Sequence, residues 1–292
     1  MTNMIKTLAL LLSLTLLLVY GGRLLAGPSG MAMGLVLAFV MNIGAYWFSD
    51  KLALKMSGAK QVTEAEAPEI YAIVRRVAGI ANVPMPSVHV IDQPAPNAFA
   101  TGRDPQHAAV AVTSGILQVM DARELTAVLA HEVGHVTNRD TLVMAVAASI
   151  AGAISFMAQM AQWSMFFGGG RDDEDNRGGA FGIVGVIAAM ILMPIAATVI
   201  QLAISRSREF GADETSAHLT QDPLALASAL RKLDAYSKRV PLPVNPSMSA
   251  LFIVRPLVPG SFTGLFSTHP PVEERIARLQ RMSGMEGPQV LS

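Results

Sequence analysis

The sequence contains no cysteine and little charge. Without cysteine, the 292-residue chain has no disulfides, no thiolate metal ligands and no cysteine nucleophile. Charged residues make up 15% of the chain, whereas a soluble domain usually has about a quarter. The net charge is +0, so nothing points to nucleic acid as a partner. Because hydrophobic residues make up 51% of the chain, we expect part of it to lie in lipid.

Four hydrophobic stretches are long enough to be transmembrane helices, which need about 20 mostly apolar residues. The third and fourth carry no charge and are longer than most core helices of soluble proteins, which usually have a polar face. The first could be a cleaved signal peptide, but it lacks a clear cleavage site and a second stretch follows at once. We therefore predict an uncleaved anchor. The stretches are residues 4–20, 31–48, 142–167 and 180–204.

Basic residues flank these stretches unevenly. Lys51, Lys55 and Lys60 follow the second stretch, and Arg206 and Arg208 follow the fourth. Cytoplasmic loops of membrane proteins are enriched in lysine and arginine. We therefore predict that both polar regions and both termini face the cytoplasm. The predicted organisation is two transmembrane helices in residues 1–50, the first part of a polar domain in 51–141, a transmembrane hairpin in 142–204 and the second part of the domain in 205–292.

The polar regions combine strand and helix patterns. Short runs rich in β-branched and apolar residues, bounded by turn residues, predict strands. Capping boxes and Asp-Pro or Pro-Pro pairs ahead of apolar residues at helical spacing predict helices. The fold class is therefore α+β and mainly helical. The predicted strands are 87–92, 97–102 and 107–113, the helices begin near 63, 121, 222 and 270, and the proline-rich section 240–259 is a loop.

The strongest chemical signal is His-Glu-Val-Gly-His at residues 131–135. On a helix, His131 and His135 project from one face about one turn apart, so both imidazoles can bind one tetrahedral metal ion. Glu132 lies about 100° round the helix and can act as general base towards a water activated by the metal. The alternative is a pair of core histidines beside a hydrogen-bonded glutamate.

A catalytic zinc site needs a third protein ligand and one open position. The extended form of the motif would require glycine at 138 and histidine at 141. The chain has Asn138 and Thr141 at these positions, so that class is excluded. The third ligand must come from elsewhere in the chain.

Glu209 is the best candidate for the third ligand. It lies five residues after the fourth hydrophobic stretch, and His131 lies eleven before the third. If these two stretches form a hairpin, the ends that carry both residues are neighbours. Asp213, one turn after Glu209, is then placed to accept a hydrogen bond from a ligand imidazole. The alternative is an exposed acidic face that pairs with nearby arginines.

Two further segments are candidate site residues. His269, ahead of Pro270-Pro271, could donate a hydrogen bond to a developing oxyanion, although a helix cap or a core position is an equally good interpretation. Asn97, Ala98 and Phe99 lie on a predicted strand whose edge could bind an extended peptide through main-chain hydrogen bonds. The alternative is an ordinary turn asparagine.

Together these motifs resemble the HtpX family of heat-shock membrane metalloproteases, which is related to the CAAX prenyl endopeptidases. The resemblance covers essentially the whole chain. It rests on HEVGH before a hydrophobic hairpin, SRSREFGAD at 205–213, STHPP at 267–271 and NAFATG at 97–102. It implies a zincin-like domain with four transmembrane helices, one Zn²⁺ bound by His131, His135 and Glu209, and Glu132 as general base. It also implies a stress-response role in quality control of damaged or misfolded membrane proteins at the bacterial inner membrane.

The leading hypothesis is therefore a membrane-anchored zinc endopeptidase with protein substrates and the lipid bilayer as its partners. One alternative is a CAAX-type peptidase that trims prenylated proteins; four spans argue against it, because that family has more. Another is a membrane chaperone or scaffold with a structural zinc. Such a site should be closed by four protein ligands, and the sequence offers three convincing ones.

Overall fold

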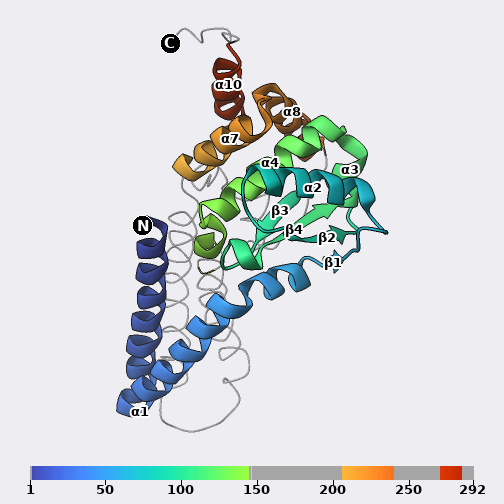
Figure 1. Cartoon of the computed structure of the whole chain (residues 1–292). Helices are drawn as coiled ribbons and strands as arrows, with labels where there is room; N and C mark the ends of the chain where they lie inside the picture. The colour runs from blue at the N-terminus through green and yellow to red at the C-terminus, as the bar shows by residue number, and fades with distance from the viewer. Residues whose placement is uncertain (1, 145, 147–205, 240–269, 285–292) are drawn as a thin grey trace.

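The computed structural model describes residues 2–144, 146, 206–239 and 270–284 (Figure 1). These residues form a helical hairpin and a domain in which helices pack on a small sheet. His269, the proline-rich section, the fourth hydrophobic stretch and most of the third lie outside the described residues. The mainly helical α+β class predicted from the sequence is confirmed for the described part of the chain.

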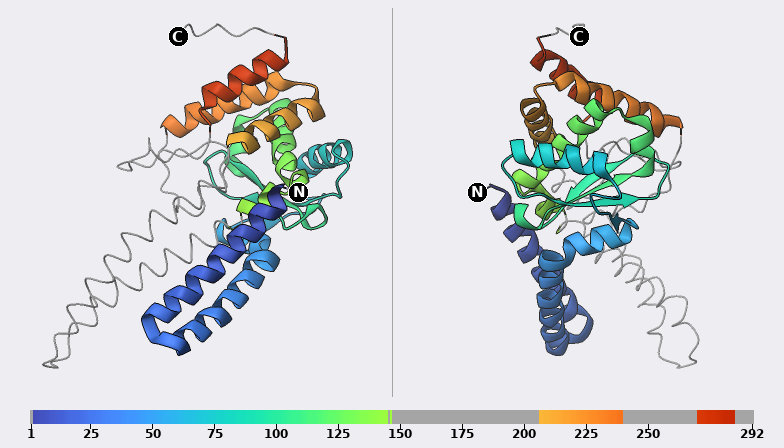
Figure 2. Two further views of the ribbon diagram at one scale, coloured as in Figure 1. Left: turned by 90° about the vertical axis from the view of Figure 1, so that its left-hand side faces the viewer. Right: turned by 45° about the vertical axis from the view of Figure 1, so that its right-hand side comes forward.

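Helix α1, Thr2–Met56, folds back on itself so that its two arms run side by side (Figure 2). The reversal lies at Gly27 and Pro28. Gly27 has φ +62°, a conformation that costs glycine little because it has no Cβ, and Pro28 has no main-chain N–H to donate. Further along, Asn42 donates from Nδ2 to Thr15 Oγ1 at 2.9 Å and links the arms.

The two arms coincide with the first two predicted spans. Among the described residues, one helical segment, Gly27–Phe48, is long and apolar enough to cross a membrane, and Thr7–Arg23 is a shorter apolar helix. The start of the third hydrophobic stretch lies beside this hairpin, because Leu142 and Val146 pack in one cluster with residues of both arms. The third and fourth spans stay predictions.

The sheet has four strands in the order β1-β2-β4-β3. β2 and β4 are parallel, whereas β1 and β3 are antiparallel to their neighbours. β3 is therefore an edge strand, and among the described residues no strand pairs with its other edge. The predicted strands are confirmed within two residues at each end. The strands are β1 (Lys60–Gln61), β2 (Ser87–Ile91), β3 (Ala98–Thr101) and β4 (Ala109–Thr113), with a 3-10 turn, η1 (Pro105–His107), before β4.

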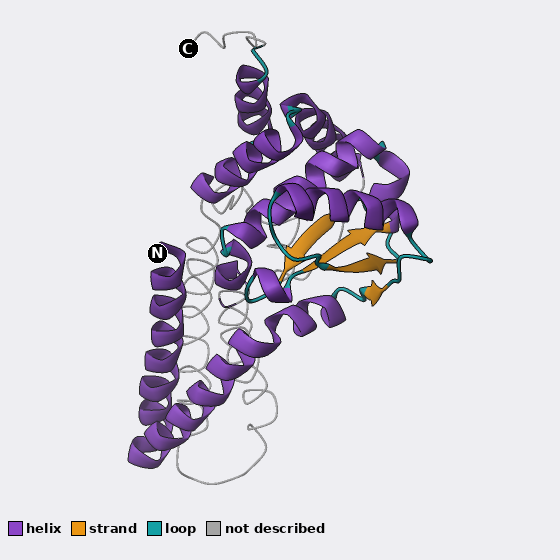
Figure 3. Cartoon of the chain, in the orientation of Figure 1, coloured by secondary structure: helices purple, strands orange, loops and turns teal. Residues whose placement is uncertain are grey.

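Helices cover one face of the sheet, and the end of α1 runs along the other (Figure 3). α2 and α4 lie over the sheet, α7 and α8 pack on α4, and α10 packs on α8 and α7. The helices are α2 (Pro68–Ile80), α3 (Ser114–Val119), α4 (Ala122–Thr137), α7 (Arg206–Thr220), α8 (Pro223–Arg239) and α10 (Val272–Met282).

One predicted helix start is wrong. The predicted capping contact exists, since Thr63 N donates to Glu66 Oε2 at 2.7 Å, but it closes a turn rather than a helix. α2 begins at Pro68, where a missing N–H costs nothing and the fixed φ suits the first helical residue. Ile70 and Val74, one turn apart on α2, are buried.

Candidate metal centre

Helix α4 carries the His-Glu-Val-Gly-His motif, and both of its ends are well defined. At its start Asp121 and Glu124 form the reciprocal capping box predicted from the sequence. Glu124 is also paired with Lys232 of α8, at 2.6 Å between Oε2 and Nζ. Almost every residue from Glu124 to the end of the motif is buried. The helix is therefore a rigid support for the histidines.

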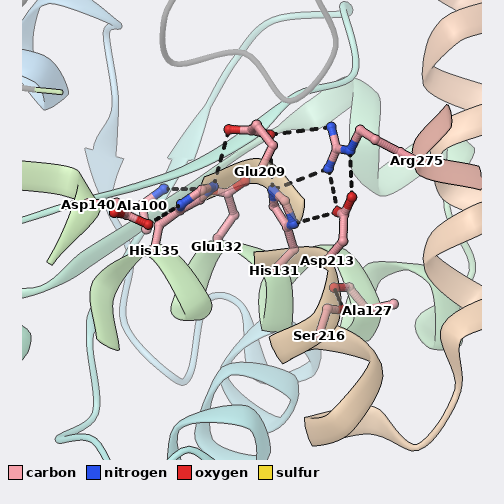
Figure 4. A network of polar contacts seen from close by, with 10 residues as sticks. All are labelled: Ala100, Ala127, His131, Glu132, His135, Asp140, Glu209, Asp213, Ser216 and Arg275. Carbon is pink, nitrogen blue, oxygen red and sulfur yellow. Dashed lines mark hydrogen bonds and ion pairs between the residues drawn. The ribbon is translucent and has the colours of Figure 1, made fainter. Parts of the chain in front are cut away.

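Helix α7 lies unusually close to α4 at the motif. A Cβ on Gly134 would come within 3.2 Å of the Thr215 Cβ, so the glycine of the motif permits this approach. Beside it, the Ser216 hydroxyl donates to the carbonyl of Ala127 at 2.7 Å (Figure 4). This contact brings the α7 residues Glu209 and Asp213 to the motif.

Glu209 lies between the two imidazoles. Its Oε1 is 3.6 Å from His135 Nε2, and its Oε2 is 3.8 Å from His131 Nε2. All three side chains are buried, and their potential ligand atoms lie within 4.8 Å of one another. Ligands bound tetrahedrally to zinc at ~2.1 Å would be ~3.4 Å apart. The three residues that the sequence proposed as ligands are therefore brought together with nearly the spacing that a metal requires.

Each imidazole has an aspartate on its other nitrogen. Asp213 Oδ1 lies 3.0 Å from His131 Nδ1, and Asp140 Oδ2 lies 3.2 Å from His135 Nδ1. A carboxylate in this position favours a proton on Nδ1 and leaves the Nε2 lone pair for a metal. Asp213 was predicted, whereas Asp140 was not. α4 ends at Thr137, and the positive φ of Arg139 (+58°) turns the chain back towards the site. Helical spacing does not predict this reversal, so it does not place Asp140 beside His135.

A buried arginine from α10 also reaches the site. The Arg275 side chain is 0% exposed and donates to both Asp213 oxygens, at 2.8 Å from Nε and 2.6 Å from Nη2. Its Nη1 is 3.5 Å from Glu209 Oε2. Burial alone would raise the pKa of Asp213, but Arg275 and His131 hold it below its usual value. Sequence pattern alone did not single out Arg275, because arginines on amphipathic helices are usually exposed.

The charge of the cluster favours a divalent cation. Among the described residues, four buried carboxylates and two arginine side chains surround the imidazoles. Buried charge is costly without compensation, and a bound divalent cation would offset part of the negative charge of the carboxylates. Although burial acts to lower it, Asp140 and Glu209 raise the pKa of His135 to about 9. The carboxylates are those of Glu132, Asp140, Glu209 and Asp213, and the arginines are Arg208 and Arg275.

Glu132 is held by the edge strand β3. Its Oε2 accepts a hydrogen bond from the main-chain N–H of Ala100 at 2.9 Å. Thr113 N donates to Asn97 O, so in the antiparallel ladder the main-chain groups of Ala98 and Ala100 point away from β4. Burial raises the pKa of Glu132, and the two histidines partly oppose this. The edge of β3 that is unpaired among the described residues therefore faces Glu132 on α4.

The predicted substrate residues lie at different places relative to this edge. The outward main-chain groups of Ala98 are next to the bond between Ala100 and Glu132. The Phe99 side chain instead packs on the opposite face of the sheet with Ile91 and Ala111, close to the end of α1. Asn97 is buried at the start of the strand. Direct substrate contact is therefore expected from Ala98 rather than from Phe99.

Comparison with known proteins gives consistent matches. Residues 64–283 match Peptidase family M48. A "Protease HtpX homolog" of Desulforapulum autotrophicum is 50% identical over 283 residues, covering 97% of this chain and 91% of the relative. The homologue of Syntrophobacter fumaroxidans is 50% identical over 283 residues, covering 97% and 100%. The homologue of Aquifex aeolicus is 50% identical over 273 residues, covering 93% and 90%.

The fold is similar to that of a solved structure. The crystal structure of S. mikatae Ste24p superposes with a TM-score of 0.53 at 18% identity. The match covers 95% of this chain and 65% of Ste24p. At this level of identity the similarity concerns the fold alone.

Proposed function

The chain belongs to peptidase family M48 and is a membrane-associated metalloprotease, and we propose that it is a zinc endopeptidase that cleaves damaged or misfolded membrane proteins at the cytoplasmic face of the bacterial inner membrane. The observation that carries the proposal is the buried cluster of His131, His135 and Glu209, whose potential ligand atoms lie within 4.8 Å of one another. Full-length similarity to HtpX proteases supports the same assignment.

Zinc is the metal that the donor set fits best. Two imidazole nitrogens and one carboxylate are a common ligand set of catalytic zinc sites. The part of the chain that the structure describes supplies three such ligands, and a catalytic zinc site keeps its fourth position for water or substrate. A structural zinc would be closed by a fourth protein ligand. The site therefore favours catalysis over the alternative of a chaperone or scaffold with structural zinc.

The side chains around the cluster have different roles in peptide hydrolysis. A bound zinc ion would supply Lewis-acid polarisation of the peptide carbonyl and of water. Glu132 takes the proton from the attacking water and delivers it to the leaving nitrogen. The Ala100 N–H fixes one oxygen of Glu132, and burial makes this carboxylate a stronger base. Asp213 and Asp140 orient His131 and His135.

The substrate is an extended peptide that lies along the free edge of β3. The outward N–H and C=O groups of Ala98 can pair with its main chain, as in other cases of strand addition. The side chain of Asn97, at the start of the strand, is proposed to contact the same peptide. His269 lies outside the described residues and is proposed to donate a hydrogen bond to the oxyanion.

The position of the site favours membrane-protein substrates. His135 lies seven residues before the third hydrophobic stretch, and Leu142 at its start packs beside the α1 hairpin. Lysines that follow Phe48 support a cytoplasmic orientation. Exposed loops and ends of membrane proteins would reach a site so close to the membrane surface. The alternative of a prenyl-protein peptidase has less support, because the Ste24p similarity concerns the fold alone.

The test replaces the proposed general base. Purified Glu132→Gln protein should retain one zinc per chain by metal analysis and lose casein digestion. Glu214→Gln is a matched control on α7, since the Glu214 side chain is 64% exposed, and it should digest casein normally. Casein digestion by Glu132→Gln protein at the wild-type rate would contradict the mechanism. Membrane proteomics of cells with wild-type or Glu132→Gln protein would identify substrates, and a prenylated peptide would test the alternative.

A further inference from the structure

The end of α1 extends beyond the apolar segment that can span a membrane. This segment ends at Phe48, whereas α1 continues to Met56. Large apolar side chains at the end of this segment and on the extension are about half exposed: Trp47 51%, Phe48 54%, Leu52 52% and Met56 50%. An aqueous surface is an unfavourable place for so many large apolar groups in about three turns of helix.

These side chains share one half of the helix with two lysines. At 100° per residue, positions 47, 48, 51, 52, 55 and 56 fall within a half-turn of one another. Lys51 and Lys55 are exposed and lie among the apolar side chains. We call these six residues the juxtamembrane face. Asp50, the acidic residue nearby, is half-buried and falls on the other half of the helix.

Contacts with the domain fix which way this face points. Leu54 lies on the other half of the helix, beside Trp47, and packs on the sheet with Ile91, Phe99 and Ala111. The end of α1 runs beneath the sheet (Figure 3). Leu54 packs on the sheet there, whereas the six residues of the juxtamembrane face are exposed. The helix cannot rotate to bury this face without losing the sheet contact.

The composition of the face fits the headgroup region of a bilayer. Tryptophan is enriched at that depth, because its ring has an apolar body and a polar N–H. Lysine can lay its apolar stem along a hydrophobic surface while its ammonium group stays with the headgroups. Lys51 Nζ does lie 5.8 Å from the centroid of the Phe48 ring. Mixed lysine and large apolar residues on one helix face are typical of binding to anionic lipid surfaces.

We propose that the juxtamembrane face lies in the headgroup layer and binds anionic phospholipids. The occupant is a lipid surface because the face continues directly from the membrane-spanning segment, and its two cations select anionic headgroups. The end of α1 also contacts the edge strand β3, which lies next to the proposed catalytic site. Arg103, two residues after β3, stacks on Trp47 at 4.7 Å, and Phe99 within β3 packs near Leu54.

Fluorescence of Trp47 provides a direct test. The chain has two tryptophans, Trp47 and Trp163, so Trp163→Phe leaves Trp47 as the only indole. The full chain is reconstituted in mixed phosphatidylcholine and phosphatidylglycerol bilayers in which either lipid carries bromine on its acyl chains at the same mole fraction. We expect brominated phosphatidylglycerol to quench more strongly, with a local enrichment of up to roughly fivefold for each lysine. Retained casein digestion shows that the Trp163→Phe protein is folded.

Removal of the lysines should abolish the preference. Lys51→Gln with Lys55→Gln should make quenching by the two brominated lipids equal, and high salt should weaken the preference of the unsubstituted protein. Lys238→Gln on α8, where the side chain is 58% exposed, is a matched control and should leave the preference unchanged. If both brominated lipids quench Trp47 equally in the protein that keeps its lysines, the proposed selectivity for anionic lipids is wrong. Absence of quenching by either lipid overturns the lipid contact itself.

Discussion

The two histidines of the motif are alike in sequence but are supported in different ways. His131 is backed by Asp213, and Asp213 is held by the fully buried Arg275 at 2.6 and 2.8 Å. His135 is backed by Asp140, five residues along the chain, and Arg208 is 4.0 Å from that aspartate. One histidine therefore depends on a helix at the far end of the chain, and the other depends mainly on a local turn.

The two supports therefore differ in whether they only position a histidine or also stabilise the fold. The support of His131 ties α10 to α7 and α4, so it contributes to the tertiary structure as well as to the site. The support of His135 is formed within one chain reversal after α4, so its loss should affect the site more than the fold. Substitutions that remove each support in turn should reveal this asymmetry.

The largest effect is expected from Arg275→Met. The substitution leaves Asp213 and Glu209 buried without their cation, and removal of one partner from a buried pair costs about 3–5 kcal/mol. We expect a large drop in the free energy of unfolding, measured by denaturant titration in detergent. Arg281→Met, at an exposed position near the end of the same helix, should change stability little. Equal stability of the two variants would contradict the structural role of Arg275.

Ala100→Pro should affect turnover without affecting metal binding. It removes the N–H that Glu132 accepts, and a hydrogen bond to a charged group contributes about 1.5–3 kcal/mol. The ladder with β4 is kept, because this N–H points outward. We expect kcat to fall about 10- to 100-fold with zinc content unchanged. Loss of zinc instead would show that β3 supports the ligands rather than the base.

Asp213→Asn should lower zinc affinity about 10- to 100-fold, because the amide no longer stabilises a proton on His131 Nδ1 as a carboxylate does. Competition with a chelator in zinc-buffered solution measures the affinity. The unfolding free energy should fall as well, since Arg275 loses its anionic partner. Unchanged affinity together with reduced stability would assign Asp213 to the fold alone.

Asp140→Asn should lower zinc affinity by about tenfold, towards the smaller end of the usual range, and leave the unfolding free energy nearly unchanged. The same chelator competition and the same denaturant titration compare it with Asp213→Asn. If Asp140→Asn destabilises the fold as much as Asp213→Asn, the proposed asymmetry between the two histidines is wrong.

The smallest effect is expected from Arg208→Gln. Its Nε lies 4.0 Å from Asp140 Oδ1, a separation too long for a hydrogen bond. We expect a change in zinc affinity of less than about fivefold, because the aspartate that backs His135 is retained. A loss of zinc affinity as large as that of Asp140→Asn would show that Arg208 is needed to hold Asp140.

Local sequence determined much of the fold. The capping box of Asp121 and Glu124 and the apolar spacing around it were sufficient to predict α4, because caps and periodicity act within a few residues. The predicted strands were also confirmed, because short apolar segments bounded by turn residues can be recognised without knowledge of distant parts of the chain. The start of α2 was wrong, because a side-chain contact at Thr63 forms in a turn as readily as in a helix.

The sequence by itself determined which groups are available to one site: His131, His135 and Glu132 on one helix, and Glu209 and Asp213 one turn apart on another. Only the tertiary structure decided how these groups are held. Arg275 and Asp140 carry no local signal, because their roles depend on the packing of α10 and on a chain reversal after α4. A charge becomes part of a metal centre only when neighbouring elements remove it from water, and that burial is a property of the fold rather than of any short segment.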